Sequence, residues 1–434
     1  FCLIFIFILY YNIINMTFYS DSNVSTKYLD PKIFTPNARC TFDLDQSEAA
    51  YLPNLRLTFI GAVSDTNVAY NDLVGALALI KNIRLMDGKT VLCSMHEAQF
   101  YTGFKNVNKA NEVNQSSASY QDCSGLGFTV NGSTNAIERV ATQFEANTTT
   151  GTTDSATLDL RHLLPMLNSV SHLPTSVFQN LNIQIEFDAV TGNQVLNADA
   201  ATLSTLRPVL ACDVINNPVV VANLNKKLKN ATWLEVEHDF FIIPQTAEDG
   251  GPNDQLVEQT TNVQINGFNN KHLERILIVK EIGDAALEQS GGNTSGFGKF
   301  SSQCCYRQKL QFRVNGRNVL PRNGMVGNNE RLAHIVDAFG ECSAYISSNQ
   351  YGMDASLELI GGAGGRALMG QLDYMGMYIG EDISNLQINY SRTGLEDATP
   401  KRATSQTLNA HVYGEVRKSL IVGGPGQGYV IRYM

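Results

Sequence analysis

The first residues that could carry chemistry are His96 and Glu97, which begin like the helix of a zinc protease. Such a helix places two histidines four residues apart on one face, with the glutamate acting as general base. Position 100 is Phe100, so the second histidine ligand is missing. The sequence therefore does not predict a zinc site here.

A glycine-rich segment, Gly362–Ala367, matches the dinucleotide-binding pattern G-x-G-x-x-A. It follows Leu357–Ile360, and Glu381 and Asp382 lie downstream. A dinucleotide site needs this loop between the strand and the helix of a βαβ unit. No alternation of strand and helix patterns surrounds the segment, so the sequence favours a flexible loop.

Glu235 and Glu237 stand two residues apart and would share one face of a strand. Two carboxylates near an aromatic residue are typical of a glycosidase, and Trp233 lies in the same segment. The sequence favours a solvated strand edge for both acids. A carbohydrate-binding or carbohydrate-active β-sandwich is kept as the alternative interpretation.

The seven histidines and eight cysteines form no recognisable ligand pattern. His162 lies beside Leu160, Leu163 and Leu164, which favours a half-buried packing residue over a catalytic base. The cysteines include no C-x-x-C pair, which argues against zinc, and their low density predicts reduced thiols. We therefore predict no catalytic residue, no cofactor, no metal and no enzymatic activity.

The charge and composition limit the possible partners. Charged residues make up 17% of the chain and the net charge is −9, so neither general attraction to nucleic acid nor sequence-specific binding of it is expected. A hydrophobic content of 43% is enough for two cores. A weakly charged surface is expected either where partners cover it or in a β protein with long neutral loops.

A hairpin pattern occurs twice in the chain and indicates the fold that positions the residues discussed above. In Leu310–Leu320, apolar and polar residues alternate up to Asn315-Gly316, a pair typical of a type I′ turn, and apolar residues then resume. The stretch Met86–Leu92 has the same order of residue types as Val314–Leu320. Each reads an apolar residue, Asp or Asn, Gly, a basic residue, a polar residue, Val and Leu.

Two further echoes follow in the same order along the chain. Asn180–Ile185 resembles Asn385–Tyr390, and the strand-like run Leu206–Ile215 corresponds to Leu408–Val416. Three matches in one order indicate two copies of an all-β module, and the changing spacing indicates loop insertions.

The predicted organisation has five parts. Residues 16–54 are expected to form an N-terminal arm, 55–216 the first module, 217–230 a linker, and 231–434 the second module with a C-terminal tail. Residues 1–15 are expected to come from upstream translation and to lie outside the fold.

The apolar N-terminus supports that last prediction. No Lys or Arg precedes Lys27, whereas a signal peptide has a basic first region. The apolar run is also shorter than a membrane span. We expect translation to start at Met16, with a signal peptide as the alternative.

Within the modules, hydrophobic periodicity predicts individual elements. Leu55–Val63 is expected to be a strand, Asn71–Ile80 a short helix, and Thr157–Pro165 a strand that turns helical. Glu330–Phe339 is expected to be a helix, and Thr407–Val422 the last long strand pair. Long loops usually carry contacts, so 105–155, 245–260, 283–302 and 340–370 are candidate contact regions, together with the N-terminal arm 17–54.

Four stretches of the chain resemble the double jelly-roll major capsid proteins of double-stranded DNA viruses. They are Leu158–Pro165 with Leu173-Pro174, Phe268–Val279, Leu310–Leu320 and Ala410–Val416. The chain looks most similar to the proteins of polinton-like viruses and virophages, with large algal and amoebal viruses as more distant relatives.

The resemblance implies an all-β protein of two consecutive eight-stranded jelly-roll β-sandwiches, with short helices in loops. It implies a homotrimer that forms a pseudo-hexagonal capsomer, and capsomers that tile an icosahedral shell around the DNA genome. The implied partners are a second and third copy of the chain, neighbouring capsomers, and vertex (penton) and minor capsid proteins. The implied location is the virion capsid, assembled inside the host cell. A minor (vertex) capsid protein is a further alternative.

Overall fold

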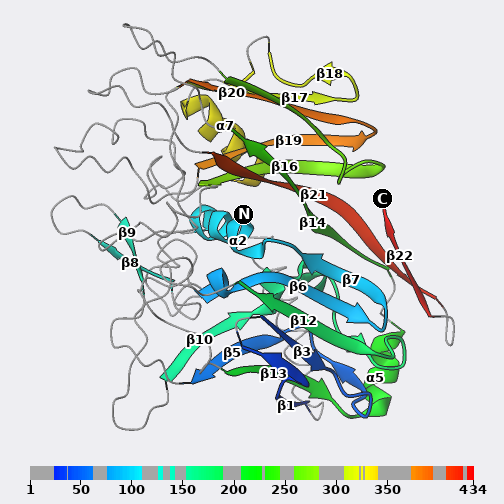
Figure 1. The fold of residues 1–434 in the computed structure, drawn as a ribbon. Coiled ribbons are helices and arrows are strands. Elements are labelled where there is room, and N and C mark those ends of the chain that lie inside the picture. Colours follow the sequence, from blue (N-terminus) through cyan, green and yellow to red (C-terminus); the bar gives the residue numbers. More distant parts are fainter. Residues whose placement is uncertain are drawn as a thin grey trace, which may run out of the picture.

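The protein folds into two β-sandwiches, one from each half of the chain, which lie one above the other in Figure 1. A computed structural model describes the following residues: 24–36, 38–61, 76–109, 126–130, 137–141, 153–188, 207–226, 230–244, 259–282, 307–321, 324–325, 328–340, 373–393, 407–423 and 428–434.

The first sandwich consists of a six-stranded and a five-stranded antiparallel sheet. The larger sheet has the order β10-β5-β13-β4-β11, with β1 also paired to β13, and the smaller sheet has the order β2-β3-β12-β6-β7. The strands are β1 (Val24–Leu29), β2 (Ile33–Thr35), β3 (Arg39–Asp43), β4 (Ala50–Tyr51), β5 (Arg56–Gly61), β6 (Ile80–Asp87), β7 (Thr90–Met95), β10 (Thr153–Asp159), β11 (Leu173–Pro174), β12 (Leu181–Phe187) and β13 (Arg207–Ile215). A separate hairpin joins β8 (Leu126–Val130) to β9 (Ile137–Ala141).

The second sandwich repeats this arrangement with a five-stranded and a four-stranded sheet. Their orders are β14-β21-β16-β19, with β22 also paired to β21, and β15-β20-β17-β18. The strands are β14 (Asn230–Ile243), β15 (Gln259–Ile265), β16 (Lys271–Ile282), β17 (Arg307–Val314), β18 (Arg317–Asn318), β19 (Asp373–Ile383), β20 (Leu386–Thr393), β21 (Leu408–Val422) and β22 (Tyr429–Tyr433). Eight strands were predicted for each sandwich, and the described residues form eleven in the first and nine in the second, some of them as short as two residues.

The predicted repeats occupy equivalent places in the two sandwiches. β12 and β20 carry the second echo. Each lies between a hairpin strand, β6 or β17, and a second strand, β3 or β15. β13 and β21 carry the third echo. Each is a central strand in the larger sheet of its own sandwich. The burial of β12 follows its sequence pattern. Leu181, Ile183 and Ile185 are buried, and the polar residues between them face outward.

The two hairpins differ by one residue in where the turn falls. Val314 pairs with Arg317, so Asn315 and Gly316 are the turn residues, with φ of 51° and 83°. This confirms the predicted type I′ turn, in which both central residues have positive φ. In the first copy Asp87 pairs with Thr90, so the turn begins at Gly88.

Helices pack against the strands of both sandwiches. α7 (Asn328–Phe339) confirms the predicted helix at 330–339, and η2 (Leu160–His162) and η3 (Pro165–Asn168) confirm the helical turn after β10. The predicted helix over 71–80 is wrong where the structure describes it, since Ala76–Leu79 is one 3₁₀ turn and Ile80 starts a strand. α2 (Ala98–Lys109), which lies between the two sandwiches in Figure 1, was not predicted.

Two predicted segment boundaries need correction. The N-terminal arm is part of the first sandwich over Val24–Tyr51, where β1 to β4 pair within both sheets. The linker contains the helix α5 (Pro218–Asn225), capped by Asn217, whose side chain accepts bonds from the Val219 and Val220 amides. Val221 and Leu224 of α5 are buried against Ile215 and Leu52, so this segment belongs to the first sandwich.

One apolar core continues from the first sandwich into the second. It contains Phe42, Ile183 and Leu57 from the first sandwich together with Trp233 and Tyr413 from the second. A second core lies entirely within the second sandwich. The two halves are therefore packed together by buried side chains, and not only joined by the chain.

Candidate functional site between the two sandwiches

Two sheet edges meet where the sandwiches touch. β7 is the outermost strand of its sheet and β14 is the outermost strand of its own. The Glu235 carboxylate of β14 accepts a hydrogen bond of 2.7 Å from the backbone amide of Ser94 in β7. We call the contact of β7, α2 and η3 with β14, β16 and β21 the junction.

Glu235 is held by a buried polar cluster at the junction. It is 1% exposed, accepts a 2.6 Å bond from Trp233 Nε1, and lies 3.3 Å from Lys418 Nζ. Glu237 is partly exposed and contacts Lys271 at 3.4 Å and the Tyr433 hydroxyl. The predicted solvated edge is therefore wrong for Glu235, and the two acids do not form an accessible glycosidase pair.

A second polar cluster centres on Glu415 of β21. Lys105 Nζ of α2 lies 2.9 Å from Oε1, Arg275 Nη1 of β16 lies 3.2 Å from Oε2, and the Tyr101 hydroxyl donates to Oε1. Burial alone would raise the pKa of Glu415, but Lys105, the Tyr101 hydroxyl and Arg275 together lower it below its usual value. Glu415 is therefore ionised and joins groups from both sandwiches.

A third cluster is a chain of histidines. His411 Nε2 lies 2.9 Å from Glu281 Oε1, and His411 Nδ1 lies 3.1 Å from His238 Nε2. Phe100 of α2 stacks on the His411 ring at a centroid distance of 4.2 Å. Burial, His411 and His96 lower the pKa of His238 to about 3, so His238 is neutral at physiological pH.

Aromatic side chains fill the space between these clusters. Phe104 of α2 packs on Tyr374 and Phe339 with ring centroids 5.2 and 4.9 Å apart. The Tyr413 hydroxyl donates a 2.6 Å bond to the Glu97 carbonyl. The junction thus combines aromatic packing with buried ion pairs and hydrogen bonds that join the two sandwiches.

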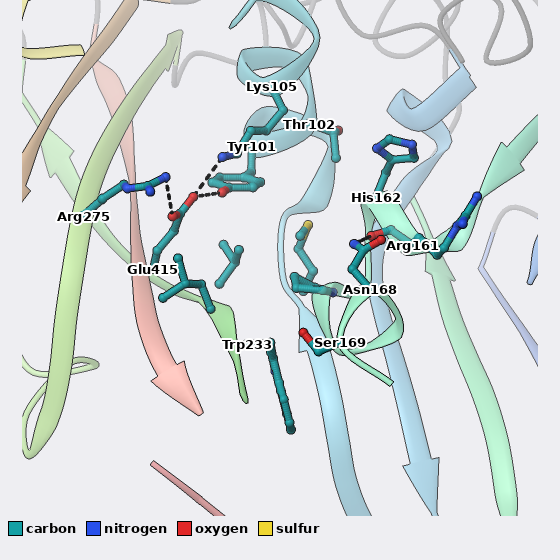
Figure 2. Close-up of a pocket in the computed structure, with 14 residues that line it drawn as sticks. Tyr101, Thr102, Lys105, Arg161, His162, Asn168, Ser169, Trp233, Arg275 and Glu415 are labelled. Atoms are coloured by element: carbon teal, nitrogen blue, oxygen red, sulfur yellow. Dashed lines mark hydrogen bonds and ion pairs between the residues drawn. The ribbon is translucent and has the colours of Figure 1, made fainter. Parts of the chain in front are cut away.

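A cavity of about 530 Å³ opens at this junction. In Figure 2, Lys105, Arg275 and Tyr101 converge on Glu415 on one side, Arg161, His162 and Asn168 lie across from them, and Trp233 lies below. Residues of both sandwiches therefore form its wall.

The remaining sequence-predicted candidates have structural positions or lie outside the described residues. His96 and Glu97 precede α2, and the Phe100 that replaces a zinc ligand packs on His411. His162 is half-buried, as predicted, and lines the cavity. Gly362–Ala367 and most of the predicted contact loops lie outside the described residues, as do residues 1–23.

Searches of the described residues add three facts. No group of three or more His, Cys, Asp or Glu side chains in this part of the chain could hold a metal ion. No helix within it is long and apolar enough to cross a membrane. Cys40, Cys93 and Cys212 are free, buried thiols.

Sequence reasoning missed the residues that meet at the junction. Lys105 and Tyr101 lie on α2, which was not predicted although Phe100, Phe104 and Val107 have the i, i+4, i+7 spacing of an apolar helical stripe. Glu415 carried a signal, because it is a charged residue inside the long run Ala410–Leu420, which is buried except at Arg417. A charge in such a run must find partners when it is buried. Which partners it finds depends on the packing of two sandwiches, which the local pattern does not encode.

The comparisons with known proteins concern the fold. The sequence matches no protein-family model and no curated protein. Among solved structures, the mavirus major capsid protein matches with a TM-score of 0.53 at 10% identity, over 94% of this chain and 90% of that chain. A chain of the PBCV-1 virus capsid matches with a TM-score of 0.50 at 11% identity, over 95% and 97%. A chain of the Sputnik virophage matches with a TM-score of 0.50 at 8% identity, over 95% and 88%.

These matches cover nearly the whole length of both partners, so both sandwiches and their connection are shared. The predicted fold class, an all-β protein of two consecutive jelly-roll sandwiches, is confirmed. This chain has the double jelly-roll fold of the mavirus major capsid protein.

Proposed function

We propose that this protein is the major capsid protein of a double-stranded DNA virus. Three copies form a pseudo-hexagonal capsomer, and capsomers tile an icosahedral shell that encloses the genome. The protein acts through its surfaces and catalyses no reaction. It is made inside the host cell and resides in the virion, where its further partners are neighbouring capsomers, vertex (penton) proteins and minor capsid proteins.

One observation carries this proposal: two equivalent sandwiches are packed into a single unit by one continuous core. Closed cyclic symmetry is the ordinary route to a homo-oligomer, and three such chains present six similar corners. A tile must keep its shape under contact from all sides. The buried clusters of Glu415 and Glu235 support that requirement because they tie β7 and α2 to the second sandwich.

The charge of the chain is consistent with this role. A net charge of −9 gives no general attraction to the packaged DNA, so the shell would enclose the genome without binding it tightly. The polinton-like or virophage type of the virus remains part of the proposal, and rests on the sequence resemblance.

The test is the mass of the purified chain in solution, measured by light scattering over a range of concentrations, together with electron microscopy. We expect a species of three chains with a six-cornered outline and a threefold axis. Disassembly at low concentration should lower the thermal unfolding temperature, because association stabilises the folded chain by mass action.

A monomer at all concentrations would contradict the proposal. If that monomer also bound oligosaccharides, the carbohydrate-binding alternative would replace it. A stable pentamer would instead support a vertex protein.

A further inference from the structure

The cavity at the junction has walls of two chemical kinds. Trp233 and Val236 of β14 and Met95 of β7 are buried and form an apolar part. Lys105 and Arg275 form a cationic part, with side chains 26% and 30% exposed. A volume of about 530 Å³ lies in the range of small-molecule sites in proteins.

The cationic part carries more positive charge than its partner neutralises. Lys105 and Arg275 share a single carboxylate, Glu415, whose two oxygens are both engaged. One carboxylate balances one of the two cations. On the opposite wall Arg161 adds no such excess, because Asp159 binds its guanidinium through both carboxylate oxygens.

Arg275 also has an unused donor at this place. Among the residues that the structure describes, its buried Nε has no hydrogen-bond partner. A buried donor without a partner is unfavourable, so it calls for an explanation. The Nε atom itself is enclosed, so an oxyanion in the cavity would contact the exposed parts of the Arg275 and Lys105 side chains and balance their excess charge.

We propose that this cavity binds a small organic anion, with a carboxylate or phosphate group at Lys105 and Arg275 and an apolar body against Trp233. The anionic group would contact α2 of the first sandwich and β16 of the second. Its binding would therefore strengthen the junction. The two possible sources of the anion, a carboxylate such as a fatty acid and a phosphate ester, share this chemistry.

The test uses octanoate as a probe and the fluorescence of Trp233, which is the only tryptophan in the chain. Octanoate should change this emission saturably and raise the thermal unfolding temperature. Octanol, which lacks the charge, should bind roughly tenfold more weakly or worse, since a hydrogen bond to a charged group contributes about 1.5–3 kcal/mol. Octyl phosphate separates the two sources by its affinity relative to octanoate.

Two matched variants locate the anion. Arg275→Gln should weaken octanoate binding roughly tenfold or more, whereas Arg275→Lys, which keeps the charge beside Glu415, should retain part of it. Arg161 lines the opposite wall of the cavity and is already paired with Asp159, so Arg161→Gln should leave the affinity for octanoate unchanged. Circular dichroism confirms that each variant is folded, and Lys105→Gln replaces Arg275→Gln if the latter does not fold.

Three results would overturn the proposal. They are a wild-type Trp233 signal that does not saturate with octanoate or octyl phosphate, equal affinities for octanol and octanoate, and equal losses in the Arg161 and Arg275 variants. Because these measurements concern one chain, they do not depend on whether the protein forms a trimer.

Discussion

The interior of the second sandwich and the junction between the sandwiches are both buried, but they differ in the types of residue that fill them. The interior is largely apolar, with Phe312, Ile388 and Ile276 packed between its two sheets. A charged exception is Lys280, which is fully buried against Tyr390. The junction adds buried charges, of which Glu415 and Glu235 are the centres. Apolar side chains accept many packings of similar energy, whereas an ion pair with hydrogen bonds is satisfied in one geometry. The interior thus stabilises a sandwich, and the junction selects how two sandwiches lie against each other.

This difference matters for the proposed function. A capsid tile needs a fixed angle between its two sandwiches, because its corners must meet equivalent neighbours. Apolar contact alone would hold the halves together without selecting that angle as sharply. The Glu415 and Glu235 clusters join residues of both sandwiches, which places the selective contacts where the angle is determined.

The largest effect is expected from Glu415→Ala at the junction. Removing the carboxylate leaves Lys105 and Arg275 partly buried without a counter-charge, and breaking a buried ion pair in this way costs about 3–5 kcal/mol. Urea unfolding followed by circular dichroism measures this loss. The native emission of Trp233 should also shift, because this residue lies at the same cavity.

The matched control is Glu274→Ala, which removes the more exposed ion pair with Arg417, where the two side chains lie 2.9 Å apart. A change of about 0–1 kcal/mol is expected there. If Glu274→Ala and Glu415→Ala lowered the free energy of unfolding equally, the buried ion pairs of the junction would contribute no more than an exposed one.

A somewhat smaller effect of about 3 kcal/mol is expected from Ile388→Ala in the interior of the second sandwich. Ile388 is fully buried, so its truncation leaves a cavity between the sheets. The native emission of Trp233 should stay unchanged, because the junction keeps its geometry. A shifted emission in this variant would show that interior and junction are not separable.

The next effect is a dependence on pH that belongs to the junction. Protonation of His238 is suppressed in the folded state, where burial, His411 and His96 lower its pKa to about 3, while the unfolded chain binds a proton near pH 6.5. The unfolded state therefore gains a proton first as the pH falls. Stability is complete above about pH 6.5 and declines by about 1.4 kcal/mol per pH unit for this one site until the pH approaches 3.

Urea midpoints measured from pH 7 to pH 5 test this decline. Burial also lowers the pKa values of His96 and His172, so part of the slope should remain in a His238→Gln variant. The difference between the two slopes isolates His238. Equal slopes would place the acid sensitivity at groups other than His238.

The sequence predicted the repeated sandwich better than the junction. Alternation in Leu181–Phe187 and in Leu310–Val314 reports which face of a strand is buried, and this is decided within one sheet. The Asn315-Gly316 turn was also predictable, because it depends on the φ preferences of two adjacent residues.

The junction depends on long-range contacts that have no local period. Lys105 and Glu415 are 310 positions apart. α2 does carry an apolar stripe, Phe100, Phe104 and Val107, but it is short and runs directly into an Asn- and Ser-rich segment. The first strands were also missed, because Pro31 and Pro36 suggested an irregular arm, although β1 pairs with the distant β13. For β1, tertiary pairing overrode the local signal.

The smallest effect is expected at the two hairpin turns, which tests whether the sandwiches are equivalent copies. Gly88 and Gly316 both have positive φ, of 59° and 83°, and an added Cβ would meet nothing closer than 3.9 Å at Gly88 and nothing within 4 Å at Gly316. Alanine at either position should therefore destabilise the protein by about 1 kcal/mol through the backbone alone. Asparagine tolerates this conformation and should cost less at both positions. Urea unfolding of the four variants tests this symmetry. A larger loss at one hairpin would mean that the turns, which begin one residue apart, have diverged in energy as well as in register.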